Sequence, residues 1–197
     1  MKNLLAFILA ISICGYSTQS VGEVSNISFP SIYVGKIETQ QWAGKPYLVV
    51  NTASMCAFTR QYVSLQKLYD NYREAGFGMV AVPSDDFNQE LSSDAEIKDF
   101  CELNYDIDMP MSETLSVKEA SAHSFFKAVE AEVGFVPSWN FNKVLIGVDG
   151  DVVGTGRSLT ALMSRSIIKA IEAELAKMEW ITMPKLRACF QSSTIVI

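Results

Sequence analysis

The chain has 197 residues, of which 22 are acidic, 16 basic, four cysteine and one histidine, and 49% are hydrophobic. This length is typical of one domain with a terminal extension, and the apolar content excludes a disordered chain. The net charge of −6 argues against nucleic-acid binding, which needs clustered Lys and Arg side chains. Four cysteines with no C-x-x-C pair form neither a disulfide-dense scaffold nor a zinc site. We therefore expect a compact acidic domain whose cysteines each need their own explanation.

Residues 1–22 are typical of a signal peptide. Lys2 precedes an apolar run from Leu4 to Ile13, and small and polar residues follow. A run of about ten residues is too short to span a bilayer but fits the apolar core of a signal peptide. We expect export to the periplasm or secretion, without stable membrane insertion. An uncleaved anchor and a lipid-modified Cys14 are the alternatives. Export places the remaining thiols where disulfides can persist.

The first unit predicted in the mature chain is β-α-β. Residues 47–50 form an apolar run typical of a strand buried on both faces. The next residues carry an apolar stripe at helical spacing, which ends at Gly76. Residues 77–82 predict a second strand, which Pro83 halts. The crossover in such a unit almost always makes the two strands parallel.

Three more helices and two more strands complete the predicted order. Ser93 and Glu96 form a capping box that opens a helix ending near residue 104. Further segments predict a helix over 121–133, strands over 142–148 and 151–154 joined by an Asp-Gly turn, and a helix over 158–177. The order β-α-β-α-α-β-β-α predicts an α/β, thioredoxin-like fold over 23–177, with a mixed central sheet flanked by helices on both faces. The tail 178–197, which contains Cys189, has no clean period and its role stays open.

Cys56 is the first candidate for chemistry. It lies between the carboxyl end of a buried strand and the first turn of a helix, where reactive groups gather in open α/β sheets. The start of a helix supplies unpaired N–H groups and a partial positive charge, and both favour the nucleophilic thiolate. The alternative is a small buried side chain that only fills space. Thr59 stands where a C-x-x-C disulfide oxidoreductase would have its second thiol.

The segment around this cysteine, NTASMCAFTRQYVSLQKLY, resembles the block around the peroxidatic residue of glutathione peroxidases. The resemblance continues in PSDDFNQELSSDAEIKDFC and SWNFNKVLIGVDG and covers about residues 27–175. It implies a thioredoxin-like fold and a peroxidase with the catalytic tetrad Cys56, Gln89, Trp139 and Asn140. Indole and amide N–H groups can donate hydrogen bonds to a thiolate and polarise a peroxide oxygen, without a metal or an organic cofactor. Taken alone, Trp139 could be a core residue and Asn140 a turn residue.

One departure from the family pattern lies next to Gln89. The family has F-G-x-Q-E, and this chain has one residue fewer between Phe87 and Gln89. Asp85 and Asp86 stand where many relatives carry Asn-Gln. If these two carboxylates lie close to Cys56, they would oppose formation of its thiolate.

Cys101 stands where relatives without selenium often place a resolving cysteine, which condenses with the sulfenic acid of Cys56 to form a disulfide. The alternative is a packed residue, since Cys101 lies on the apolar face of its predicted helix. The α-carbons of a disulfide lie within about 7 Å of each other, so we expect local unfolding around residues 94–105 during turnover. His123 matches a family position with no catalytic duty.

The resemblance implies a peroxidase that reduces hydrogen peroxide or organic and lipid hydroperoxides through a sulfenic acid. The resolving cysteine implies a thioredoxin-like protein as electron donor, with glutathione as the alternative. The long insertion that tetrameric relatives use for assembly is missing between residues 111 and 136, which favours a monomer. The rival functions are an exported thiol–disulfide oxidoreductase and a non-catalytic redox sensor on the same fold.

Overall fold

The computed structural model describes residues 26–182, so the predicted signal peptide and residues 183–197 lie outside the described residues. Two short strands and a 3-10 turn come first, and the predicted β-α-β-α-α-β-β-α order follows. The elements in chain order are β1 (Ser28–Pro30), β2 (Lys36–Glu38), η2 (Thr39–Trp42), β3 (Tyr47–Thr52), α1 (Gln61–Tyr72), η3 (Arg73–Ala75), β4 (Gly78–Pro83), α2 (Asp94–Tyr105), α3 (Ser124–Val133), β5 (Lys143–Ile146), β6 (Val152–Gly156) and α4 (Arg165–Thr182).

The four-stranded sheet has the order β4-β3-β5-β6. β3 pairs with β4 in parallel, with Tyr47 opposite Gly78, which confirms the predicted crossover. β5 runs antiparallel to both β3 and β6, so the sheet is mixed. Gly150, in the turn between β5 and β6, has a φ of 86°, a conformation that suits glycine.

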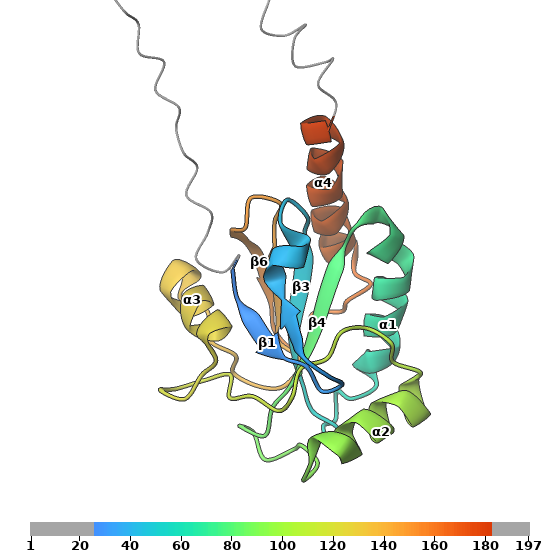
Figure 1. Ribbon diagram of the computed structural model, residues 1–197, viewed down its shortest axis with the longest axis vertical. Helices are drawn as coiled ribbons and strands as arrows, with labels where there is room; N and C mark the ends of the chain where they lie inside the picture. The colour runs from blue at the N-terminus through green and yellow to red at the C-terminus, as the bar shows by residue number, and fades with distance from the viewer. Residues whose placement is uncertain (1–25, 183–197) are drawn as a thin grey trace, which may run out of the picture.

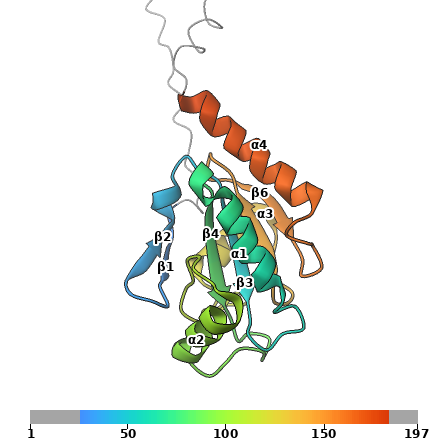
Figure 2. The same cartoon turned by 90° about the vertical axis from the view of Figure 1, so that its right-hand side faces the viewer.

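Helices cover both faces of this sheet, as predicted. β3 is buried along its whole length, and its side chains alternate between two hydrophobic clusters. Leu48 and Val50 pack with α1, α2 and α4, whereas Tyr47 and Val49 pack with α3 and the β1–β2 hairpin. Figures 1 and 2 show α1 and α4 on one face and α3 on the other, with α2 beyond the carboxyl ends of β3 and β4. That end of the sheet carries the residues of the candidate site.

Two parts of the fold differ from the prediction. The β1–β2 hairpin was not predicted, because its strands have only three residues each. The last helix begins at Arg165, seven residues later than predicted, after turns that cover 157–164, and it runs to Thr182, five residues into the predicted tail. Ser164 caps this helix, since its Oγ accepts the Ile167 N–H at 3.5 Å. Within residues 26–182, no helix combines the length and the apolar character that crossing a membrane requires.

Candidate active site

Cys56 lies in a series of tight turns between β3 and α1. Its side chain is buried, with 8% of its surface exposed, and Sγ accepts the backbone N–H of Phe58 at 3.4 Å. Cys56 lies between β3 and the start of α1 at Gln61, as predicted, and Phe58 also precedes the helix. The expected N–H donor is therefore present, but it comes from the turn and not from the helix.

Thr59 holds this turn together. Its Oγ1 accepts the Cys56 N–H at 3.0 Å and lies 2.7 Å from the Cys56 carbonyl oxygen, to which it can donate. The same hydroxyl lies 2.9 Å from the carbonyl oxygen of Ala53. A hydroxyl thus stabilises the turn at the position where a disulfide oxidoreductase would have its second thiol.

Gln89 and Asn140 are joined across 51 positions of sequence. Asn140 Nδ2 donates to Gln89 Oε1 at 3.1 Å, and Asn140 is fully buried. The Met55 N–H donates to the Gln89 carbonyl at 2.9 Å, so the Gln89 loop is tied to the residue before Cys56. This arrangement leaves the Gln89 amide N–H groups as donors for a bound ligand. The structure thus brings these two predicted residues together beside the Cys56 turn.

Trp139 lies at the surface beside the same loop. Its side chain is 40% exposed, and its ring centroid lies 5.3 Å from that of Phe87 at an interplanar angle of 44°. The alternative of an ordinary core tryptophan is therefore wrong. An exposed indole next to the Gln89 loop is available to a substrate.

Asn51, which was not predicted as a site residue, fixes the turn that carries Trp139 and Asn140. Asn51 Nδ2 donates to the Trp139 carbonyl at 3.0 Å, and Asn51 Oδ1 accepts the Asn142 N–H at 2.9 Å. Asn142 Nδ2 donates to the same Trp139 carbonyl at 2.8 Å. The one signal in the sequence was a polar residue at the end of an apolar strand.

Backbone strain flanks both amides of the site. Asn88, which precedes Gln89, has a φ of 55°, and Phe141, which follows Asn140, has a φ of 61°. Left-handed backbone is unusual for a residue other than glycine and more so for a bulky one. It persists where surrounding contacts impose it, and the Phe141 N–H indeed donates to the Asn51 carbonyl at 2.6 Å.

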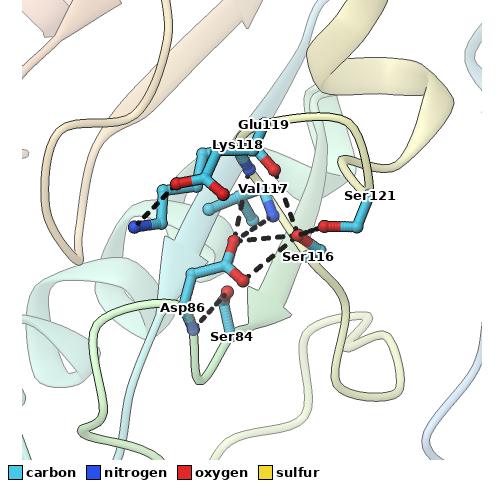
Figure 3. A network of polar contacts seen from close by, with 7 residues as sticks. All are labelled: Ser84, Asp86, Ser116, Val117, Lys118, Glu119 and Ser121. Carbon is cyan, nitrogen blue, oxygen red and sulfur yellow. Dashed lines mark hydrogen bonds and ion pairs between the residues drawn. The ribbon is translucent and has the colours of Figure 1, made fainter.

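The carboxylate of Asp86 is engaged by the 116–118 loop (Figure 3). It accepts the Val117 N–H at 2.6 Å and the Lys118 N–H at 3.2 Å, and the Ser116 hydroxyl lies 3.1 Å from both of its oxygens. These donors neutralise part of its charge. Its effect on the chain is therefore to tie two loops together.

Asp85, the other carboxylate of this pair, accepts a hydrogen bond within its own loop. Asp85 Oδ1 accepts the Glu90 N–H at 3.0 Å. Beyond the Asp86 contact, the Lys118 Nζ lies 5.0 Å from the centroid of the Phe87 ring, which packs against Trp139. Both carboxylates thus have N–H partners that support the loop around Gln89.

Glu90 is a second residue of the site that was not predicted from the sequence. Its Oε1 accepts the N–H groups of Ser54 and Leu91, both at 2.9 Å, so it joins the Gln89 loop to the end of β3. Its Oε2 is buried without a hydrogen-bond partner among the described residues. Burial raises the pKa of this carboxyl.

Cys101 lies inside the protein on α2, with 1% of its surface exposed. It belongs to the same hydrophobic cluster as Cys56, and both thiols are free. Burial raises the pKa of the Cys101 thiol to about 12, although the neighbouring Tyr62 hydroxyl acts in the opposite direction. The packed alternative describes this state, because the Cys101 thiol lies in the hydrophobic core and out of contact with solvent.

His123 has a structural position. It caps α3, where Nδ1 accepts the Phe125 N–H at 3.4 Å, and its ring stacks on Phe29 at a centroid distance of 4.7 Å. Burial lowers its pKa. Over residues 26–182, no group of three or more His, Cys, Asp or Glu side chains is arranged to hold a metal ion.

Comparison with known proteins places these features in one family. The family model for glutathione peroxidase matches residues 25–130, which is more than half of the chain and includes Cys56, Gln89 and Cys101. The glutathione peroxidase homolog BsaA of Bacillus subtilis is 38% identical over 138 residues, covering 63% of this chain and 86% of that protein.

Two further similarities concern an enzyme and a solved structure. The hydroperoxy fatty acid reductase gpx1 of Synechocystis is 37% identical over 128 residues, covering 59% of this chain and 76% of that protein. The crystal structure of Trgpx in apo form is 26% identical, with a TM-score of 0.62, and covers 79% of this chain and 97% of that one. The second similarity agrees with the thioredoxin-like α/β fold described above.

Proposed function

The chain belongs to the glutathione peroxidase family and is a peroxidase, and from this premise we propose that Cys56 is the residue that attacks the peroxide. Its thiolate attacks one oxygen of the hydroperoxide and the O–O bond breaks. Hydroxide or an alkoxide leaves and takes a proton from solvent to become water or an alcohol, and Cys56 becomes a sulfenic acid. The observation that carries this proposal is the Cys56 sulfur, which accepts the Phe58 N–H in a turn tied directly to the Gln89 loop.

Gln89, Asn140 and Trp139 complete the proposed site. The hydrogen bond between the two amides orients Gln89, so that its N–H groups can donate to a peroxide oxygen as charge develops on it. The exposed Trp139 indole adds a further N–H donor at the mouth of the site. None of these roles requires a metal or an organic cofactor.

Cys101 is the proposed resolving residue. Its thiolate attacks the Cys56 sulfenic acid, the S–S bond forms, the S–O bond breaks, and hydroxide leaves with the proton of Cys101 as water. The burial of Cys101 supports local opening of α2 before this step, because a thiol with a pKa of about 12 is not ionised in the closed state. An opened helix returns the thiol to water, where its pKa falls.

The proposed substrates include organic and lipid hydroperoxides, and the proposed electron donor is a thioredoxin-like protein. The exposed apolar side chains of Trp139 and of Met55, which is 64% exposed, support a bulky apolar substrate. The similarity to the hydroperoxy fatty acid reductase of Synechocystis also supports it. Residues 1–22 support export, so that the protein works outside the cytosol, and the insertion missing between residues 111 and 136 supports a monomer.

A steady-state assay with alternative donors tests the proposal. We expect wild-type protein to consume hydrogen peroxide over many turnovers with thioredoxin, thioredoxin reductase and NADPH, and more slowly with glutathione. Cys56→Ser should abolish consumption. Cys101→Ser should still form one sulfenic acid but lose turnover with thioredoxin.

Mass spectrometry of peroxide-treated protein checks the resolving step separately. A Cys56–Cys101 disulfide is the expected product, and an untouched Cys101 thiol contradicts the resolving role while leaving the peroxidase intact. Activity that survives Cys56→Ser contradicts the peroxidatic role itself. A single round of oxidation without turnover with either donor would instead identify a redox sensor.

A further inference from the structure

Lys143 carries a buried ammonium group that the proposed reaction does not use. Its side chain, on β5, is 2% exposed, and it forms no ion pair within the described part of the chain. The groups that accept hydrogen bonds from Lys143 Nζ are neutral. They are Gln61 Oε1 at 2.7 Å, the Ser158 carbonyl at 3.4 Å and the Arg157 carbonyl at 3.5 Å. Burial lowers its pKa to about 8.

The buried ammonium group of Lys143 lowers the stability of the folded protein in two ways. A buried charge without an opposite charge loses its hydration and gains little in return. Gln61 is also the first residue of α1, so the ammonium group lies near the positive end of the helix dipole. Residues that lower the stability of a protein are concentrated at functional sites, so a functional role for Lys143 is expected.

A continuous set of buried hydrogen bonds leads from Lys143 to the candidate site. Gln61 Nε2 donates to the Ser158 carbonyl at 2.7 Å, so Lys143 and Gln61 hold the same peptide group. Ser158 Oγ in turn donates to the Asn140 carbonyl at 2.6 Å and accepts from Asn142 Nδ2 at 3.2 Å. The ammonium group is thus two contacts away from the main chain of Asn140.

We propose that Lys143 is a positioning residue for the peroxidase reaction: it fixes Ser158, and Ser158 fixes the turn that aims Asn140 at Gln89. The strained backbone at Phe141 explains why such support is needed, because that turn relaxes unless its neighbours hold it. The inference rests on the proposed function, since it assigns Lys143 to the site built around Cys56.

Two single variants and their combination test this inference. Lys143→Met keeps an unbranched side chain one atom shorter and removes its charge and donors, and Ser158→Ala removes the link to Asn140. Lys169→Met, at an exposed position of α4, is the matched control. For each protein the second-order rate constant of Cys56 oxidation by hydrogen peroxide is measured from the loss of Cys56 alkylation. The denaturation midpoint in urea is measured in parallel.

We expect Lys143→Met and Ser158→Ala each to lower the rate constant about tenfold or more, since small displacements of positioning groups have effects of this size. The double variant should be no slower than the slower single variant, because both act through one path. Lys143→Met should unfold at the same or a higher urea concentration, which separates positioning from loss of fold.

Two results overturn the inference. One is an unchanged rate constant in Lys143→Met, and the other is a double variant whose loss is the product of the two single losses. If wild-type Cys56 itself fails to react with peroxide, the proposed function fails first, so the two failures are distinguishable.

Discussion

The buried charge of Lys143 makes the free energy of unfolding of this protein depend on pH in the alkaline range. The perturbation is the substitution Lys143→Met, which removes the titrating group and keeps a long apolar side chain on β5. With only 2% of its surface exposed, Lys143 is screened little by solvent, so its pKa can be converted to a free energy.

The magnitude follows from the two pKa values. Burial lowers the pKa of Lys143 from 10.5 to about 8, and each tenfold change in proton affinity is worth about 1.4 kcal/mol. Below pH 8 both states bind the proton, and the folded state is destabilised by about 3 kcal/mol relative to one with a neutral amine. Between pH 8 and 10.5 the unfolded state binds a proton that the folded state does not, so the free energy of unfolding rises with pH. Above pH 10.5 the amine is neutral in both the folded and the unfolded state, so the charge no longer lowers the free energy of unfolding.

Urea unfolding followed by circular dichroism at several pH values between 7 and 10.5 measures this effect. The quantity of interest is the difference in unfolding free energy between wild type and Lys143→Met, because the other titrating groups cancel in it. We expect this difference to shift by about 3 kcal/mol in favour of the wild type as the pH rises. Lys127→Met, an exposed position on α3, should show no such shift. Parallel curves for wild type and Lys143→Met would refute the reasoning, since they would mean that water reaches the ammonium group.

Three further substitutions test the contacts around the site. Asn51→Ala removes a donor to the Trp139 carbonyl and an acceptor for a backbone N–H of the same turn. It should lower the unfolding free energy by about 2–3 kcal/mol and slow Cys56 oxidation. An unchanged oxidation rate would contradict the role of Asn51 in holding this turn. Asp86→Asn weakens charge-assisted bonds to the 116–118 loop and should cost about 1–2 kcal/mol in urea unfolding, whereas an equal midpoint would show that the charge is unimportant there. Gly78→Ala places a methyl group against the Trp42 indole; it should lower the melting temperature, with a cost of about 1–3 kcal/mol, and an unchanged melting temperature would show that the indole moves aside freely.

Local pattern was enough to predict the central elements. The apolar run that became β3, the stripe of α1 and the capping box of α2 each depend on neighbouring residues, and Ser93 indeed accepts the Glu96 N–H at 3.3 Å. The start of α4 could not be predicted in this way. Ser158 has a favourable side chain for a helix start, but it is held by Asn140, 18 positions earlier, and so lies in a turn.

The site was predictable where a motif carried it and not where tertiary contacts did. Cys56, Gln89 and Asn140 came from segments similar to one family, and the amide contact across 51 positions agrees with that pairing. Asn51 and Glu90 lie in the same segments, but their roles depend on which distant N–H group faces each side chain. A sequence pattern does not contain that information.

The backbone conformation and the buried side chain of Phe141 favour different amino acids at this position. Its left-handed backbone favours glycine, whereas its fully buried ring packs edge-on against Tyr62 at a centroid distance of 5.5 Å. Glycine would relieve the strain and leave a large cavity, and no other amino acid satisfies both requirements. Selection for heat resistance should therefore leave this position unchanged and gather its gains in distant parts of the molecule.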